Sequence, residues 1–202
     1  MRRNSIMRNP LQIPTLIILF SLTLGIAPAP EPAIGPGEVL AQMMKKGEMY
    51  AAPGAPHALI DKLTGNWKTT TVVMGMEAEI GFSENVMLLD GRFLEMNYKG
   101  LFVGLELKGK VILGYDNYKH KFTAVFIDNL NTSLRTAEGV LDHSGTVLSL
   151  WGTMDEWLTD EHDKPVLYIF KFLDPNKILF EVHDLSLTTA NTKIVEVTYD
   201  KE

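Results

Sequence analysis

The chain has 202 residues, of which 46% are hydrophobic and 22% charged, a composition typical of a globular protein with one domain or one domain and a tail. Its formal net charge is −6 and no basic run is longer than two residues, so there is no electrostatic basis for binding nucleic acid. The absence of cysteine excludes disulfides, thiolate nucleophiles, sulfur-ligated metals and lipid attachment to a cysteine.

The first thirty residues have the pattern of an export signal. Arg2, Arg3 and Arg8 precede a short apolar stretch over residues 11–27, and small residues follow it. We therefore predict that residues 1–30 are a signal peptide or, if they are not cleaved, an N-terminal anchor, and that the protein is exported to the periplasm or secreted. Contact with a membrane is expected only through this segment, if it is retained.

Residues 31–55 are interpreted as a linker. They begin rich in Pro, Ala and Gly, which is typical of an extended chain. Apolar residues over 38–50 recur on one helical face, so a short helix could form there. A second short helix is predicted over 57–63, because Leu59, Ile60 and Leu63 have helical spacing and Gly65 stands just past its end.

From Trp67 onward the pattern predicts β-strands. Runs of Val, Ile, Thr, Tyr and Phe alternate with turn residues about every ten positions. The predicted strands cover residues 67–74, 77–89, 92–99, 105–115, 119–127, 133–142, 145–154, 165–173, 177–186 and 192–200. The short connections make neighbouring strands antiparallel and leave no room for βαβ units.

Ten hairpin-linked strands leave exposed edges unless the sheet closes. We therefore predict an all-β fold for residues 56–202, an antiparallel up-and-down β-barrel of about ten strands with a short N-terminal helix. A β-sandwich is the alternative architecture.

The sequence Gly65-Asn66-Trp67, which opens the first strand after a short helix, resembles the Gly-x-Trp signature of lipocalins and other calycins. In those proteins the tryptophan plugs the closed end of the barrel, so the resemblance implies a structural role for Gly65 and Trp67. A longer series of motifs is similar to the bacterial domain-of-unknown-function family 1579, a calycin-like barrel. These motifs are Pro56-His57, Leu63-Thr64-Gly65-Asn66-Trp67, Gly91-Arg92-Phe93-Leu94, Tyr98-Lys99-Gly100, Leu113-Gly114-Tyr115-Asp116-Asn117, Ala137-Glu138-Gly139 and Val195-Glu196-Val197-Thr198-Tyr199. The resemblance covers positions 50–202 and implies a fold but no activity.

Arginine and tyrosine side chains are the candidates for holding a ligand. Every second residue of a strand faces inward, and the more apolar face of 92–99 would carry Arg92 and Tyr98 into the barrel. Arg135 shares a face with the small residues Ala137 and Gly139, which leave space beside it. An interior arginine near tyrosine hydroxyls could pair with a carboxylate or phosphate, whereas an arginine at a strand end would only cap the barrel. The predicted ligand-binding residues are Arg92, Tyr98, Tyr115, Arg135, Tyr168 and His183.

His183 suggests a separate hypothesis. It alternates with Glu181 and Leu185 on a late strand, and if that face points inward, a neutral imidazole could ligate haem iron. The alternative is a hydrogen-bonded histidine in the barrel wall.

The sequence contains no motif for catalysis or metal binding. An HExxH pair, a Gly-x-Ser-x-Gly elbow and a phosphate-binding glycine loop are all absent, so neither a catalytic residue nor a metal ligand is predicted, the cofactor is unknown and catalysis stays open. The favoured function is an exported barrel that binds a small apolar or amphipathic ligand. The alternatives are a structural or envelope-interaction module with a filled barrel, and a haem-binding barrel.

Overall fold

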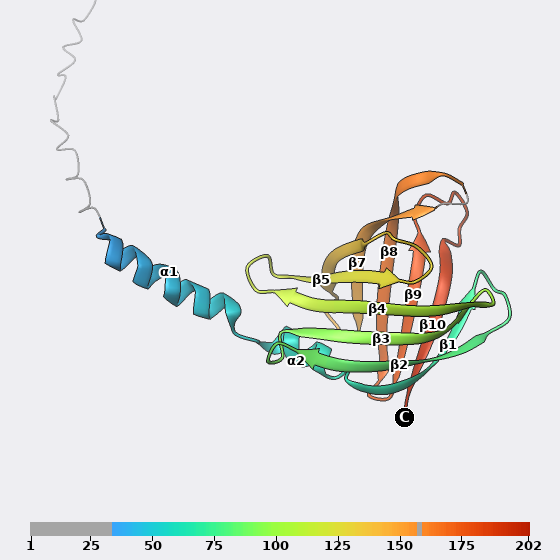
Figure 1. Ribbon diagram of the computed structural model, residues 1–202, viewed down its shortest axis with the longest axis horizontal. Coiled ribbons are helices and arrows are strands. Elements are labelled where there is room, and N and C mark those ends of the chain that lie inside the picture. Colours follow the sequence, from blue (N-terminus) through green and yellow to red (C-terminus); the bar gives the residue numbers. More distant parts are fainter. Residues whose placement is uncertain (1–33, 157–158) are drawn as a thin grey trace, which may run out of the picture.

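The computed structural model describes residues 34–156 and 159–202, and it consists of ten antiparallel strands closed into a barrel and preceded by two helices (Figure 1). This confirms the predicted fold class. The proposed signal segment, residues 1–30, lies outside the described residues, and the predicted domain boundaries stay predictions. The helices are α1 (Pro36–Ala51) and α2 (Ala55–Asp61). The strands are β1 (Gly65–Val73), β2 (Glu79–Leu88), β3 (Phe93–Phe102), β4 (Leu105–Asp116), β5 (Lys121–Asp128), β6 (Arg135–Leu141), β7 (Val147–Glu156), β8 (Glu161–Asp174), β9 (Lys177–Asp184) and β10 (Lys193–Lys201).

Each strand pairs with its neighbours in the sequence, and β1 pairs with β10 to close the barrel. Thr69 of β1 therefore lies opposite Tyr199 on one side and Gly81 on the other. The pairing of β7 with β8 continues as far as Glu156 and Glu161, so β8 begins four residues before the predicted position at 165. The reason is that backbone pairing tolerates the charged side chains of this hairpin, which the hydrophobic pattern alone does not read as strand.

Side chains alternate between the interior and the outer face of the barrel, except where the strand register shifts near Ile194, Asp155 and Leu173. On β5, for example, Phe122, Ala124 and Phe126 are buried, while the residues between them are more exposed. The interior side chains form a single hydrophobic core that runs through all ten strands. The fully buried large residues include Trp67, Leu94, Leu113, Leu148, Leu150 and Phe170.

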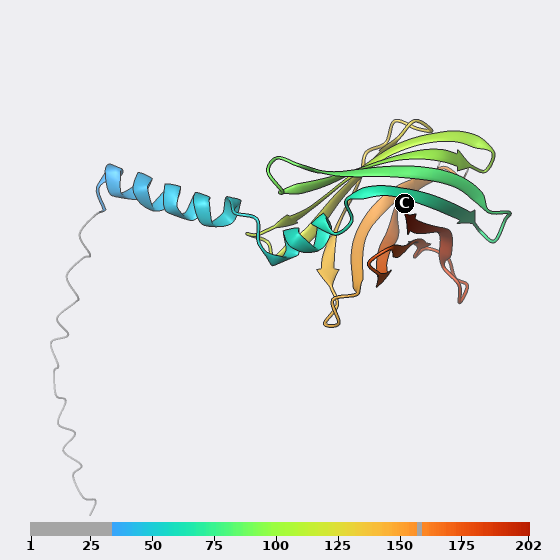
Figure 2. The same ribbon diagram turned by 90° about the horizontal axis from the view of Figure 1, so that it is seen from below.

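Helix α2 covers one end of the barrel, which we call the closed end (Figure 2). The carbonyl oxygen of Leu63, just after the helix, accepts hydrogen bonds from Trp67 Nε1 and Asn85 Nδ2, both at 2.9 Å. Trp67 is 1% exposed and lies in the core at this end. Gly65 adopts a φ of 116°, a conformation that L side chains rarely take, as the chain turns from the helix into β1.

His57 attaches α2 to the barrel. Its Nδ1 accepts a hydrogen bond from the Gly54 backbone N–H at 3.0 Å, and its ring packs edge-on against Tyr115 of β4. Burial lowers the pKa of His57; a hydrogen bond to the Tyr115 backbone opposes this effect, and the positive charge of Arg92 adds to it.

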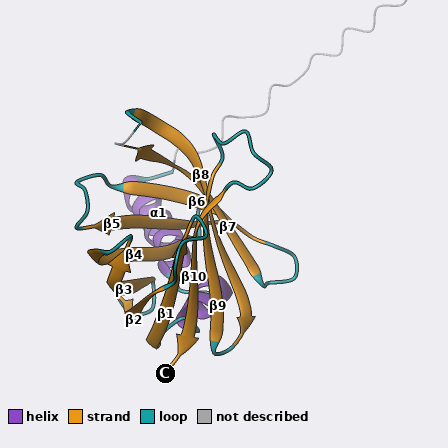
Figure 3. Ribbon diagram, turned by 90° about the vertical axis from the view of Figure 1, so that its right-hand side faces the viewer, coloured by secondary structure: helices purple, strands orange, loops and turns teal. Residues whose placement is uncertain are grey.

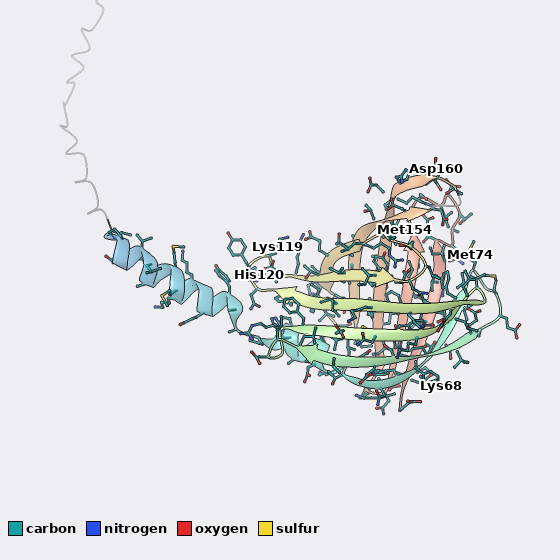
Figure 4. The ribbon with its side chains drawn as sticks, in the orientation of Figure 1. Lys68, Met74, Lys119, His120, Met154 and Asp160 are labelled. Carbon is teal, nitrogen blue, oxygen red and sulfur yellow. The ribbon has the colours of Figure 1, made fainter. Side chains whose placement is uncertain are left out.

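The opposite end of the barrel, formed by the turns at residues 74–78, 103–104, 129–134 and 185–192, has no helix over it, and we call it the open end. Figure 3 views the molecule along its long axis, with the helices behind the strands. Figure 4 shows Met74 at the open end and His120 near α2.

Helix α1 projects away from the barrel, and none of its residues is buried (Figure 2). Only its C-terminal end is attached, because Asn117 Nδ2 donates hydrogen bonds to the Tyr50 and Ala52 carbonyl oxygens, each at 2.8 Å. The ring of Tyr50 packs against that of Tyr118 in an edge-on geometry. In the part of the chain that the structure describes, no helix is both long and apolar enough to cross a membrane.

Strands β6 and β7 approach so closely at Gly139 that an added methyl group should lower the stability of the barrel. A Cβ atom on Gly139 would lie 1.8 Å from the Ser149 carbonyl oxygen, whereas a Cβ atom on Gly109 would be 3.5 Å from its nearest neighbour. We expect Gly139→Ala to lower the free energy of unfolding by about 3 kcal/mol, because the backbone must shift. Gly109→Ala is the control and should cost less than about 1 kcal/mol. Urea denaturation measures both, and equal values for the two variants would contradict the tight approach of β6 to β7.

The lowered pKa of His57 predicts a pH dependence of stability. The unfolded chain takes up the histidine proton near its ordinary pKa of 6.5, whereas the folded protein does so only at lower pH. The free energy of unfolding should therefore fall as the pH drops below about 6.5 and level off below the folded pKa. His57→Gln, whose side chain can still accept the Gly54 hydrogen bond, should reduce this slope between about pH 7 and pH 5. An unchanged slope in denaturation series would rule out His57 as its source.

Candidate functional site

A cavity of about 310 Å³ occupies the barrel interior toward the open end. Nine of the ten strands contribute to its lining, whereas the interior near α2 is filled by side chains such as Trp67 and Leu94. The residues that form its apolar lining include Phe102, Leu107, Val111, Phe126, Met154, Tyr168, Phe180, Val182, Val195 and Val197.

Three aromatic rings form one wall of this cavity. The rings of Phe126 and Tyr168 are stacked with centroids 4.3 Å apart, and the ring of Phe180 lies 6.2 Å from that of Tyr168 and within 7° of parallel. Phe126 comes from β5 and Tyr168 from β8, with β6 and β7 between them. The intervening strands carry the small residues Ala137 and Gly152 inward, opposite one another, and so leave space between β5 and β8. The three aromatic rings fill this space as a stack of nearly parallel planes.

One ion pair stands beside the aromatic wall. Arg135, at the start of β6, donates a charge-assisted hydrogen bond from Nη2 to the Asp128 carboxylate at the end of β5. The Arg135 Nε is buried and has no hydrogen-bond partner among the described residues. The two side chains are 27% and 10% exposed, so the pair lies partly sheltered at the open end.

Tyrosine hydroxyls supply uncharged polar groups to the cavity. Burial raises the pKa of Tyr168, and the positive charge of Arg135 only partly offsets this, so the phenol is protonated at neutral pH. Burial likewise raises the pKa of Tyr199. Across the cavity, the hydroxyls of Tyr98 and Thr71 lie 3.2 Å apart and share a hydrogen bond. The interior therefore offers hydroxyl donors without a net charge.

A second ion pair lies on the interior face close to the open end. Lys164 Nζ and Asp184 Oδ2 are 2.7 Å apart, and their side chains are 9% and 5% exposed. Burial by itself raises the pKa of Asp184, but hydrogen bonds from Lys164 and Ser186 hold it below its ordinary value. Both groups are thus charged at neutral pH and satisfy one another.

Of the six predicted ligand-binding residues, the structure brings Tyr98, Arg135 and Tyr168 together in the cavity lining. Arg92 and Tyr115 lie at the closed end, and their predicted position in the ligand cavity is corrected. Arg92 donates a hydrogen bond to the Leu89 carbonyl at 3.0 Å, because it belongs to the β2–β3 turn and not to the inward-facing part of β3. Tyr115 packs on His57 and lines a separate groove beside α2.

His183 lies on the outer face of β9, which corrects the expectation that it could reach an interior haem. The inward residues of this strand are Phe180 and Val182, and alternation turns His183 to the opposite side. There its Nδ1 lies 3.1 Å from Thr192 Oγ1 and its Nε2 lies 3.4 Å from Glu181 Oε2. Glu181 in turn pairs with Lys171 and Lys193, so this cluster is an exterior charge network.

Sequence reasoning did not include Phe126 and Phe180 among the ligand-binding residues. Alternation alone could have placed each of them inward, since Phe126 follows Phe122 and Ala124, and Phe180 lies between Ile178 and Val182. What it could not show is that both rings converge on Tyr168. Within residues 34–156 and 159–202, no group of three or more His, Cys, Asp or Glu side chains is arranged to hold a metal ion.

Comparison with known proteins gives a family. The sequence matches the family described as "Protein of unknown function (DUF1579)" over residues 52–201. No curated protein matches it significantly. Among solved structures, a redesigned β-barrel is 12% identical, with 72% of this chain and 94% of that chain covered at a TM-score of 0.38. EF1p2_mFAP2b bound to DFHBI is 9% identical, with 72% of this chain and 98% of that chain covered at a TM-score of 0.40. An S-type phycobiliprotein lyase from Guillardia theta is 9% identical, with 77% of this chain and 96% of that chain covered at a TM-score of 0.46.

The ion pair in the cavity predicts that Arg135 contributes to stability. Arg135→Leu leaves the Asp128 carboxylate sheltered without its cation and should lower the free energy of unfolding by about 1–3 kcal/mol. Adding Asp128→Asn removes the unpaired charge and should recover part of the loss. Arg92→Leu is the matched control, because Arg92 meets an exposed Asp90 at 3.6 Å and such pairs contribute less than about 1 kcal/mol. A loss for Arg135→Leu no larger than the control's would contradict the sheltered position.

Proposed function

Because the chain belongs to the DUF1579 family, whose function is unknown, we propose its function from the geometry of the barrel: it is an exported binding protein for a small apolar or amphipathic molecule. The observation that carries the proposal is the uneven filling of the interior. Side chains such as Trp67 and Leu94 fill the interior near α2, where the remaining space is a groove beside the helix, while a cavity of about 310 Å³ is left inside the barrel at the open end. A barrel that acts only through its surface does not require an unfilled cavity in its interior.

The lining of the cavity supports an amphipathic ligand. Sites for small molecules are concave, mostly apolar and supplied with a few polar groups that orient the ligand. Here Phe126, Phe180 and Val182 provide apolar surface, and Arg135 with the Tyr168 hydroxyl provides the polar groups. Burial of the apolar part of a ligand drives binding at about 25 cal/mol per Å², and the polar groups select its orientation.

Export is proposed on the amino-acid sequence alone. The arginines at positions 2, 3 and 8, the apolar stretch over 11–27 and the small residues after it support export. In this proposal the ligand is met outside the cytoplasm, and the barrel carries or sequesters it there.

Mass spectrometry of the protein purified from the envelope of its own host tests both parts of the proposal. Under native conditions we expect a reproducible additional mass of a small molecule that is lost on denaturation. The denatured chain should be shorter than the full sequence by roughly thirty residues if the signal is cleaved. A ligand-free mass that persists after challenge with fatty acids and with small neutral aromatic molecules would contradict the binding function and favour a barrel that acts through its surface.

A pair of variants locates the bound molecule. Val182→Trp fills the cavity from β9 and should abolish the additional mass, while Val86→Trp adds the same bulk to an exposed position of β2 and should retain it. Retention of the ligand by both variants would place the binding site elsewhere on the protein.

A further inference from the structure

We infer that the cavity selects an uncharged, flat aromatic molecule that carries a hydrogen-bond acceptor such as a ring carbonyl. This inference rests on the proposed function and adds the chemical class of the ligand. It follows from the shape of the cavity wall, the size of the cavity, the pairing of its charges and the chemistry of its free donors.

The shape of the wall favours a flat ligand. Tyr168 and Phe180 are within 7° of parallel, and Phe126 lies within 21° of the Tyr168 plane. All three rings line the cavity and belong to rigid strands. Offset-stacked and edge-to-face ring pairs add attraction beyond the area they bury. A planar ring system can use this attraction, whereas a flexible acyl chain would gain only from burial and would lose conformational entropy.

The size of the cavity favours a small ligand. Its volume of about 310 Å³ lies at the lower end of the range of about 300–1,000 Å³ that is usual for small-molecule sites. A molecule of a few rings fits this space better than a macrocycle or a long-chain lipid.

The charges of the cavity favour a neutral ligand. Among the described residues, both cations of the cavity lining are paired, Arg135 with Asp128 and Lys110 with Glu95. Close to the open end, Lys164 contacts Asp184 and Glu161. An anionic ligand would thus have to compete with a carboxylate already held by Arg135. It would also approach Glu156, a further carboxylate in the lining. Desolvating an ion without a free counter-charge is costly, so an uncharged molecule is favoured.

The donors of the cavity favour a ligand with an acceptor. Arg135 Nε is buried without a hydrogen-bond partner among the described residues, and the guanidinium has further N–H groups beyond the one that binds Asp128. The Tyr168 hydroxyl in the same lining is protonated and can also donate. A sheltered donor without an acceptor costs free energy, which an acceptor on the ligand recovers. A carbonyl oxygen on the edge of an aromatic ring reaches these donors while the ring lies along the wall.

Three naphthalene probes test the inference by fluorescence titration of the purified protein. 6-Propionyl-2-(dimethylamino)naphthalene is a neutral ketone, N-phenyl-1-naphthylamine is neutral without a carbonyl, and its 8-sulfonate is an anion. We expect the ketone to bind about tenfold more tightly than the neutral amine, and the sulfonate to bind most weakly. Tighter binding of the sulfonate than of both neutral probes would overturn the inference, as would equal affinities for all three.

Two variants with matched controls assign the selectivity to residues. Arg135→Lys keeps a cation for Asp128 but removes the guanidinium donors, so the preference for the ketone should fall by about tenfold. Arg92→Lys makes the same change at the closed end and should have no effect. Phe180→Leu should weaken both neutral probes, whereas Phe82→Leu, on the exposed face of β2, should not. An unchanged ketone preference in Arg135→Lys would overturn the role of the guanidinium.

The fatty acid cis-parinaric acid separates this inference from the proposed function. Suppose that cis-parinaric acid binds the unmodified protein but not Val182→Trp, and that the aromatic probes do not bind. The ligand class is then wrong and the binding function stands. If neither cis-parinaric acid nor any aromatic probe shows binding that Val182→Trp abolishes, and native mass spectrometry finds no ligand, the proposed function itself fails. The relative affinities of the probes for the unmodified protein do not depend on whether any variant folds.

Discussion

The pairing of β1 with β10 is the constraint on which the rest of the structure depends. Through it the backbone groups of the first and last strands satisfy one another, and no strand is left as an open edge. Closure also fixes which side of every strand is the interior, because side chains alternate with a period of two. A shift of β1 by one residue against β10 would turn Trp67 outward together with every other core residue of β1.

The distribution of side-chain volume along the barrel axis determines where a ligand could bind. At the closed end, α2, Trp67 and the leucines of four strands fill the interior, and hydrogen bonds from Trp67 and Asn85 to one carbonyl secure the helix. Toward the open end, Ala137 and Gly152 contribute almost no volume, so Phe126 and Tyr168 can meet above them. The same small residues that allow tight packing of β6 on β7 thus create the aromatic wall.

The charges of the barrel are arranged differently on its two faces. On the outer face of β8, β9 and β10, Glu181 contacts Lys171, Lys193 and His183 in a network that is partly open to water. On the inner face, Arg135 pairs with Asp128, and Lys164 contacts both Asp184 and Glu161. The interior cations are therefore paired within the wall, and hydroxyls and spare guanidinium donors are among the remaining polar groups of the cavity.

The sequence by itself determined the architecture, because strand period and turn residues are local properties of the chain. Alternation over 92–99 and 133–142 also placed Tyr98 and Arg135 inward, and the motif around Gly65 and Trp67 identified where the barrel begins.

The tertiary structure decided which inward residues share a level of the barrel. Strands far apart in the sequence bring Phe126, Tyr168 and Phe180 together, and no local pattern encodes that register. It also decided that Arg92 and His183 lie outside the cavity. One residue at the β2–β3 turn and one step of alternation on β9 are enough to move a side chain from the interior to the surface.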